Sequence, residues 1–459
     1  MKSLSIGNEQ GIARPFQLNL NWLLFISIHI PLALIMEASS IVATLHALAT
    51  IGVGVWIALS TREPRKVAWV AAYICGADVL WRMTNAQVFW EFGKYAIILV
   101  LGIYLLRVRR WRSAGLPILF FVMFLISVPL TIASLDAGAA REEISFNLSG
   151  PLCLAVCALF FYQIKLSAED REQTVWYLAT PVIGIAAVCF WGIMTADQLS
   201  FTSESNFATS GGFGPNQVSA ILGLGALLLL LLALQPQKRR GRLVKLLGAL
   251  TLLTLSTLTF SRGGLYNIAA ALLVSSLFFL KNRRMRYSFT MLLGAIILFG
   301  GLVVLPQLNS FTDGWFAIRF SDTDPTNRLN ILQAEIDIWM NNPVFGVGPG
   351  LAKYFSSFIF GMRIAAHTEY TRILAEHGIP GIISIILLLL MGIKALKRAP
   401  TDLDRAWVAA LLVWPMIEMT HAAMRIASIG FIFGFALVNW NPKIDNNSIQ
   451  EPREPFINR

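Results

Sequence analysis

Long apolar segments recur along almost the whole of this 459-residue chain. A helix needs about 20 mostly apolar residues to cross the hydrocarbon core of a bilayer, because its backbone amides find no water there and must bond to one another. Hydrophobic residues make up 56% of the chain and charged residues only 14%, a balance that excludes an ordinary soluble protein. The sequence therefore predicts an all-α, polytopic bundle of about 12–14 transmembrane helices.

Short connections separate most of the predicted spans. The spans cover residues 22–38, 39–60, 67–83, 92–107, 116–134, 150–164, 174–194, 217–235, 243–259, 264–280, 288–305, 370–393, 406–420 and 426–440. One connection, residues 306–369, is far longer than the others, and connections of such length in a compact protein are usually functional. We expect it to form one large, partly helical loop.

That loop contains one predicted helix. Thr326 and Asn327 are suited to cap its start, and the pair at 342–343, Asn-Pro, ends it. Apolar residues recur along one side of it, at Leu329, Leu332, Ile336 and Trp339. This periodicity predicts a helix that lies with this stripe on the membrane surface or over a cavity between the spans.

Basic residues fall in alternate connections. They cluster at residues 62–66, 107–112, 165–171, 238–245, 281–286 and 394–405. Because Lys and Arg in short loops stay on the cytoplasmic side, this alternation predicts two cytoplasmic termini. The loop 195–216, the turn 261–264, the long loop and the connection 421–425 then lie on the opposite, periplasmic side. The formal net charge of +11 is thus an orientation signal, and no nucleic-acid partner is expected.

One histidine and several arginines gather on that opposite side. His367 can accept a proton near neutral pH, although a histidine bonded at a helix start is an equally ordinary structural feature. Arg262 is a permanent cation at the membrane boundary, suited either to grip a phosphate through two donors or to reach lipid phosphates. Further arginines on the long loop are Arg319, Arg328 and Arg363. This group of cations favours an anionic ligand, a diphosphate above all.

Several kinds of chemistry lack their motifs. The sequence has no HExxH for zinc, no GxSxG nucleophile elbow and no acidic cluster for Ca²⁺ or Mg²⁺. The glycine-rich turns at 211–216 and 346–350 are neither Walker nor dinucleotide-binding sequences, although their glycines would allow a ligand to approach the backbone. We therefore expect a reaction that needs neither metal nor cofactor.

Three motifs together resemble the O-antigen ligase and polymerase superfamily of bacterial envelope glycosyltransferases. They are Thr259-Phe260-Ser261-Arg262-Gly263-Gly264, the run from Asn342 to Gly350, and the run from His367-Thr368-Glu369-Tyr370 to Gly381. The resemblance covers roughly residues 200–390, and the order, spacing and common side of the motifs make it fairly specific. It implies a helical membrane fold of the GT-C kind and no required metal.

The resemblance also implies roles for residues. His367 would be the general base and Arg262 would hold the donor diphosphate, with Arg319, Arg328, Arg363, Asn216 and Glu369 as substrate-binding candidates. Ligases often carry another arginine before the turn that contains Asn216, and residues 203–214 have none. Arg328 or Arg319 would then supply the second cation. The donor would be an undecaprenyl-diphosphate-linked glycan, and the acceptor lipid A–core or a growing polysaccharide, among membrane lipids.

The predicted organisation has four parts. They are N-terminal transmembrane helices (1–200), a ligase-like catalytic region (201–393), C-terminal transmembrane helices (394–440) and a cytoplasmic tail (441–459) in the bacterial inner membrane. The acceptor decides between a ligase, a polymerase and a protein O-oligosaccharyltransferase, and the sequence leaves these open. A transporter of lipid-linked sugars is the alternative of a different class. Its charges should line a path at the membrane midplane, and the spans offer few such residues, chiefly Asp78, Glu418 and Glu37.

Overall fold

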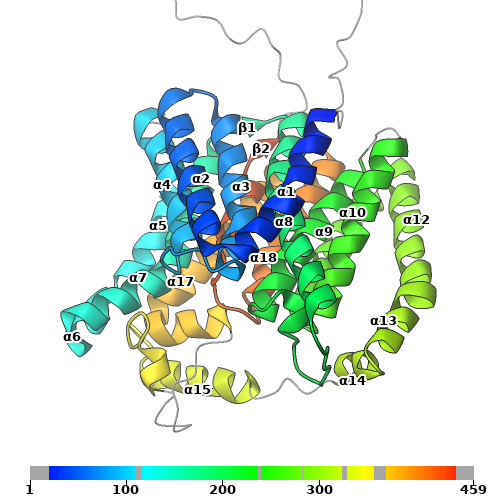
Figure 1. Cartoon of the computed structure of the whole chain (residues 1–459). Coiled ribbons are helices and arrows are strands. Elements are labelled where there is room, and N and C mark those ends of the chain that lie inside the picture. Colours follow the sequence, from blue (N-terminus) through cyan, green and yellow to red (C-terminus); the bar gives the residue numbers. More distant parts are fainter. Residues whose placement is uncertain are drawn as a thin grey trace, which may run out of the picture.

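The computed structural model describes residues 20–108, 115–235, 239–281, 283–322, 328–355 and 368–440. This part of the chain is a bundle of helices that run side by side (Figure 1). Each of the predicted spans is occupied by helix, which confirms the all-α fold. The structure is therefore that of a multi-pass membrane protein.

The first part of the bundle is made of eight helices that pack mainly on one another. They are α1 (Leu20–Ala38), α2 (Ser40–Ser60), α3 (Pro64–Met83), α4 (Phe92–Val108), α5 (Gly115–Leu125), α6 (Val128–Ser134), α7 (Ala137–Tyr162) and α8 (Ala168–Thr195). Two short parallel strands, β1 (Lys165–Leu166) and β2 (Asn439–Trp440), join this part to the end of the described chain.

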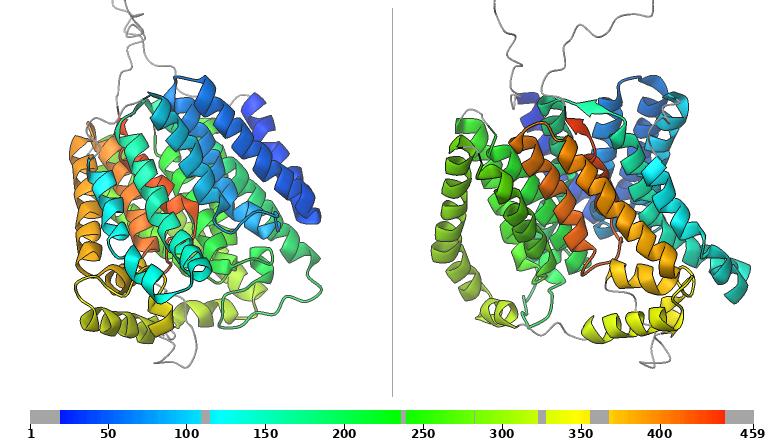
Figure 2. Two further views of the ribbon diagram at one scale, coloured as in Figure 1. Left: turned by 90° about the vertical axis from the view of Figure 1, so that its left-hand side faces the viewer. Right: turned by 180° about the vertical axis from the view of Figure 1, so that it is seen from behind.

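The remaining helices complete the bundle and cover one of its ends. They are α9 (Pro215–Ala233), α10 (Arg239–Leu258), α11 (Gly263–Phe279), α12 (Arg283–Phe299), α13 (Leu305–Phe311), α14 (Trp315–Ser321), α15 (Arg328–Asn341), α17 (Glu369–Arg398), α18 (Asp402–Glu418) and α19 (Ala427–Ala436). A short 3₁₀ turn spans Ala208–Ser210, and one π-helical segment, Gly300–Val304, joins α12 to α13. Together α12 and α13 form a bent arm along one side of the bundle (Figure 2).

Eight helices in the described parts of the chain are long and apolar enough to cross a membrane. They are Ser40–Ser60, Gly115–Ser134, Ala137–Tyr162, Ala168–Thr195, Pro215–Ala233, Gly241–Leu258, Met285–Phe311 and Glu369–Arg398. Two of them depart most from the predicted spans. The span 116–134 is divided between α5 and α6, and the span 150–164 belongs to α7, which begins at Ala137. The Asp136 carboxylate caps α7 by accepting from two backbone amides, so the charged residues that follow it are helical as well.

The two ends of the bundle differ in what they carry. The start of α1 and the β1–β2 pair lie at the upper end in Figure 1, so the first and last described residues share one end. The loop between α8 and α9 lies at the other end with α14 and α15 (Figures 1 and 2). This is the sidedness that the alternation of basic connections requires.

Small residues allow the helices to approach closely. On α19, Gly430 and Gly434 face α7, where an added Cβ would overlap backbone atoms of Leu154 and Cys157. Within the bilayer the hydrophobic effect does not drive helices together, because lipid tails are as apolar as the side chains. Close packing is therefore a main source of helix association. The contact fixes α19, and with it the connection from α18, against the centre of the bundle.

Candidate active site

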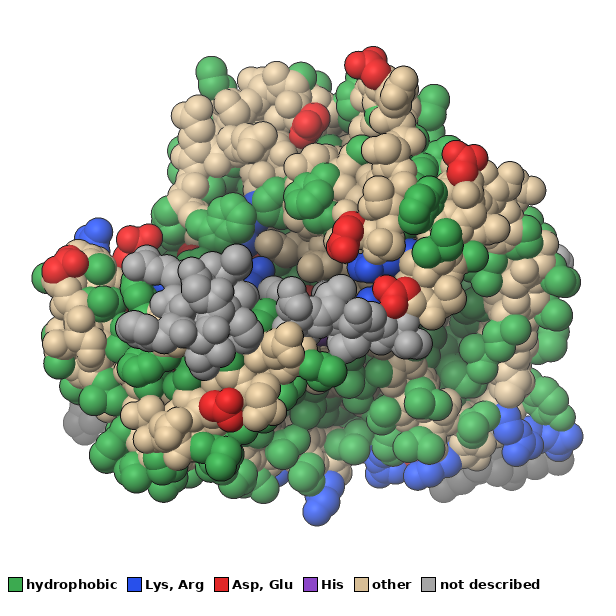
Figure 3. All heavy atoms as spheres, turned by 90° about the horizontal axis from the view of Figure 1, so that it is seen from below, with side chains coloured by type: hydrophobic (Ala, Val, Ile, Leu, Met, Phe, Trp, Pro, Cys, Tyr) green, Lys and Arg blue, Asp and Glu red, His purple; other side chains and the backbone are tan. Residues whose placement is uncertain are grey.

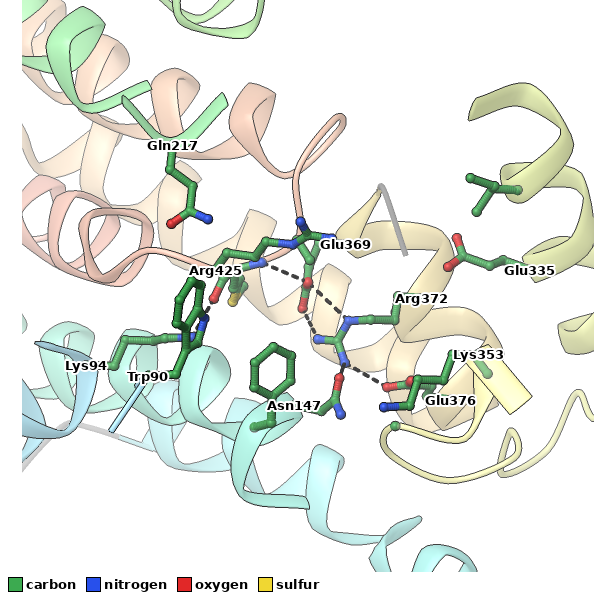
Figure 4. Close-up of a pocket in the computed structure, with 16 residues that line it drawn as sticks. Trp90, Lys94, Asn147, Gln217, Glu335, Lys353, Glu369, Arg372, Glu376 and Arg425 are labelled. Atoms are coloured by element: carbon green, nitrogen blue, oxygen red, sulfur yellow. Dashed lines mark hydrogen bonds and ion pairs between the residues drawn. The ribbon is translucent and has the colours of Figure 1, made fainter. Parts of the chain in front are cut away.

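A cavity of about 430 Å³ opens at the end of the bundle that carries α15. Its walls come from α4, α7, α9, α15, α17, the segment 350–353 and the connection between α18 and α19. Seven charged side chains line it, namely Lys94, Glu335, Lys353, Glu369, Arg372, Glu376 and Arg425 (Figure 4). Seen from below, this end shows basic side chains in the hollow near its centre (Figure 3).

Arg372 lies at the centre of the charged wall. Its guanidinium forms ion pairs with Glu369, one turn before it, and with Glu376, one turn after it, where the N–O distance is 2.7 Å. It also donates to the side-chain oxygen of Asn147 on α7, at 3.1 Å. Because i+3 and i+4 neighbours share a helix face, the sequence alone brings these three charges together. The pairing compensates three buried charges and ties α17 to α7.

The glycine-rich turn at 346–350 holds the first half of α17 in place. The backbone amides of Val347 and Gly348 donate to the carbonyl oxygens of Ala375 and Glu376, both at 2.9 Å. Gly346 has a φ of +66°, and a Cβ there would overlap the backbone of α17. Gly378, with a φ of +58°, bends α17 just after this contact. These amides therefore bond to α17 and position its charged residues.

Replacing Gly346 with Ala is expected to destabilise the protein. The left-handed backbone alone costs a residue with a Cβ about 1–3 kcal/mol, and the overlap with α17 adds to that. Thermal unfolding of the purified protein measures the effect. The matched control is Gly102→Ala in α4, where a Cβ meets nothing within 4 Å and alanine favours the helix. Equal melting temperatures for Gly346→Ala and the wild type would contradict this role.

The loop helix α15 packs on the protein with a side other than its predicted apolar stripe. Its buried residues are Ile331, Ala334, Glu335 and Ile338. Leu329, at the head of the predicted apolar stripe, is 61% exposed, so the stripe does not form the contact of α15 with the rest of the protein. The reason is that α15 packs against α17, where the Thr371 hydroxyl donates to the Glu335 carboxyl. The polar contact between Thr371 and Glu335 therefore helps to set the rotation of α15 about its axis, which the apolar periodicity alone did not indicate. The predicted end of this helix at Asn341 is confirmed.

Glu335 is expected to make stability depend on pH. Burial raises the pKa of Glu335 from 4.5 to about 7. As the pH rises, the unfolded chain releases this proton first, so the folded state loses stability between about pH 4.5 and 7 and no further above it. Glu335→Gln removes this contribution. Melting temperatures of the two proteins should diverge across that interval, with the variant becoming relatively more stable, whereas parallel curves would exclude the proposed burial of the proton.

The residues predicted from the sequence lie in three places. Glu369 lines the cavity and is fully buried. Asn216 accepts a hydrogen bond from the Ser261 hydroxyl at 2.8 Å, and its neighbour Gln217 lines the cavity. Arg262 donates to the backbone carbonyl of Asp322. Asn216 and the turn that contains Ser261 and Arg262 thus adjoin the cavity through the start of α9.

The arginines of the long loop are distributed differently. Arg319 is buried and donates to the carbonyl oxygens of Phe260, at 3.0 Å, and Ser203, at 2.6 Å. It therefore joins the turn before Arg262 to the loop between α8 and α9. Arg328 begins α15, but its side chain is outside the described residues, as are Arg363 and His367.

Sequence reasoning missed the four cations of the cavity, Lys94, Lys353, Arg372 and Arg425. The sequence did contain a signal for them. Most Lys and Arg residues lie in the connections predicted to be cytoplasmic, and these residues are among the few on the other side. In the described chain no three His, Cys, Asp or Glu side chains are grouped as metal ligands. The arrangement is instead suited to binding an anion and to moving a proton between buried carboxyl groups and a ligand.

The fold and the cavity together define a polytopic helical membrane protein with a charged pocket at one end of its bundle. A family model described as O-antigen ligase matches residues 247–386. This match confirms the resemblance over that segment to the O-antigen ligase superfamily, and it supports a membrane glycosyltransferase of the ligase or polymerase type. No curated protein and no solved structure matches the chain.

Proposed function

We propose that this protein transfers an oligo- or polysaccharide from undecaprenyl diphosphate to an acceptor hydroxyl, without metal or cofactor. The observation that carries the proposal is the charged cavity, part of whose wall, from α15 and the first half of α17, lies within the segment that matches the O-antigen ligases. The resemblance to the O-antigen ligases supports lipid-linked glycan substrates. A pocket that opens at the end of a membrane bundle suits a substrate whose lipid stays in the bilayer while its head group reacts in water.

The proposed reaction is a single displacement. His367 takes the proton from the acceptor hydroxyl as its oxygen attacks the anomeric carbon of the donor sugar. The bond from that carbon to the diphosphate oxygen breaks with inversion, and the diphosphate leaves with the electron pair. Arg262 holds the diphosphate, since a fixed cation stabilises the negative charge that accumulates on the leaving group.

The other candidate residues are assigned to substrate binding and its support. Arg328, Arg363 and Asn216 are proposed to contact the donor or acceptor. Arg319, which bonds to the backbone of Phe260, just before Arg262, and of Ser203 in the loop between α8 and α9, is proposed to hold the Arg262 turn in place. Glu369 is proposed to support substrate binding by holding Arg372 at the cavity wall through their ion pair.

We infer that the reaction takes place on the periplasmic side of the bacterial inner membrane, with both termini in the cytoplasm. The support is the clustering of Lys and Arg in connections at the end opposite the cavity. Accessibility labelling of single cysteines in intact cells tests this orientation. A cysteine at Glu204, in the loop between α8 and α9, should react with a membrane-impermeant reagent, and one at Glu63 should not.

A reconstituted transfer assay tests the proposed function. The purified protein is incubated with undecaprenyl-diphosphate glycan and with three acceptor classes, lipid A–core, free polysaccharide and a Ser/Thr peptide. Mass spectrometry of the products identifies the acceptor and so separates ligase, polymerase and protein glycosylation. Movement of intact donor across vesicle membranes without product would instead establish transport and refute the proposal.

A further inference from the structure

The connection between α18 and α19 is held by buried charged side chains rather than by regular structure. The backbone amide of Met424 donates to a Glu369 carboxylate oxygen at 3.1 Å, and its carbonyl oxygen accepts from Lys94 Nζ at 2.8 Å. Three residues later, the amide of Ala427 donates to Asp78 at 2.9 Å. The same few residues of backbone are therefore fixed from α17, α4 and α3.

Each of these three side chains is itself buried and paired. Asp78 is paired with Arg82 at 3.1 Å, Lys94 with Glu91, and Glu369 with Arg372. Hydrogen bonds in which one partner is charged are shorter and about twice as strong as neutral ones. Burying so many charges costs free energy that apolar packing does not, so the arrangement is more consistent with fixing a geometry than with adding stability.

Arg425 is the residue that this arrangement positions. It lies between the two anchored amides and lines the cavity, across from Trp90 and Lys94 (Figure 4). Burial lowers the pKa of Arg425, because its positive charge is moved partly out of water, and the nearby Glu369 carboxylate acts in the opposite direction. A phosphate oxyanion in the cavity would offset that lost hydration, and a planar guanidinium can donate to two of its oxygens at once.

We propose that Arg425 binds a phosphate group of the lipid-linked donor, and that Lys94 and Asp78 are positioning residues that hold its backbone at the cavity wall. The identity of the ligand rests on the proposed function. Binding by a cation that is already fixed loses little conformational entropy, which is the advantage of anchoring a loop in this way.

Binding of undecaprenyl diphosphate to the full-length protein in detergent tests the role of Arg425. Arg425→Ala should weaken binding by about 10-fold or more, the loss expected for a charge-assisted hydrogen bond, and Arg425→Lys by less. Arg405→Ala is the matched control, because Arg405 pairs with Asp402 at the far end of α18. Undecaprenol, which lacks phosphate, should bind the wild type and Arg425→Ala equally. Unchanged diphosphate affinity in Arg425→Ala would overturn the proposal.

A double-mutant cycle tests the positioning role of Lys94. If Lys94 acts through Arg425, Lys94→Met should weaken diphosphate binding in the wild type and have no further effect when Arg425 is already alanine. Lys94→Arg, which keeps the charge and a donor, should restore part of the affinity. Additive losses in the double variant would overturn the positioning role, because Lys94 would then contribute independently.

The two proposals fail in different ways. Glycan transfer by the wild type together with normal diphosphate binding by Arg425→Ala would leave the transferase intact and remove Arg425 from it. Conversely, phosphate-dependent binding that is lost in Arg425→Ala would support the inference even if the transfer assay gave no product.

Discussion

Replacing Arg372 with Met is expected to lower the free energy of unfolding by about 3–5 kcal/mol, the largest effect on stability that we anticipate. Arg372 is 5% exposed, and its charge compensates those of Glu369 and Glu376, which are also buried. Methionine keeps the bulk of the side chain but leaves two carboxylates without their cation and Asn147 without its donor. Thermal unfolding, followed by loss of monodisperse protein in detergent, measures the change.

Two comparisons make this experiment specific. Arg405→Met removes an arginine whose ion pair with Asp402 is partly exposed, so its effect should stay below about 1 kcal/mol. Neutralising the partners together, as Glu369→Gln and Glu376→Gln in the Arg372→Met background, should recover part of the lost stability. An Arg372→Met protein as stable as the wild type would mean that the ion pairs at the cavity wall do not hold α17.

His367→Ala is expected to lower the rate of glycan transfer by about 100- to 10,000-fold, the contribution typical of a general base. Its melting temperature and donor affinity should stay close to those of the wild type, because the residue is proposed to act on the acceptor proton alone. The wild-type rate should also fall as the pH is lowered through the range in which histidine becomes protonated. Full activity in His367→Ala would remove the proposed base.

The bundle could be predicted from the sequence because its determinants are local. Apolar length gave the spans, and the position of Lys and Arg in alternate connections gave their sidedness. The predicted bounds were wrong where a helix-capping residue extends a helix beyond its apolar part. Asp136 caps α7 and draws a charged stretch into the helix, so that helix begins well before its apolar part.

The cavity could not be predicted in the same way, because its contacts join residues that are distant in the sequence. Lys94 bonds to the backbone of Met424, and Arg372 bonds to Asn147. Neither helical periodicity nor hydropathy carries information on such pairs. The sequence indicated Asp78 as a charge near the membrane midplane. In the structure its carboxylate accepts a hydrogen bond from the Ala427 amide and so helps to fix the connection after α18.

Glu369 illustrates which part of the site could be predicted from a sequence motif. The resemblance makes Glu369 a substrate-binding candidate, and in the structure this residue lies in the cavity wall. Its partner Arg372 and the second partner of that arginine, Glu376, belong to the same motif, yet their pairing becomes visible only with the helix. A helical wheel of residues 369–376 would have revealed it.

The most direct test of this account is a structure of the protein with undecaprenyl diphosphate bound. The account predicts the diphosphate at the cavity end of the bundle, within hydrogen-bonding reach of Arg262 or Arg425, and His367 on the same side of the membrane. Diphosphate bound elsewhere, or His367 and Arg262 facing opposite compartments, would contradict it.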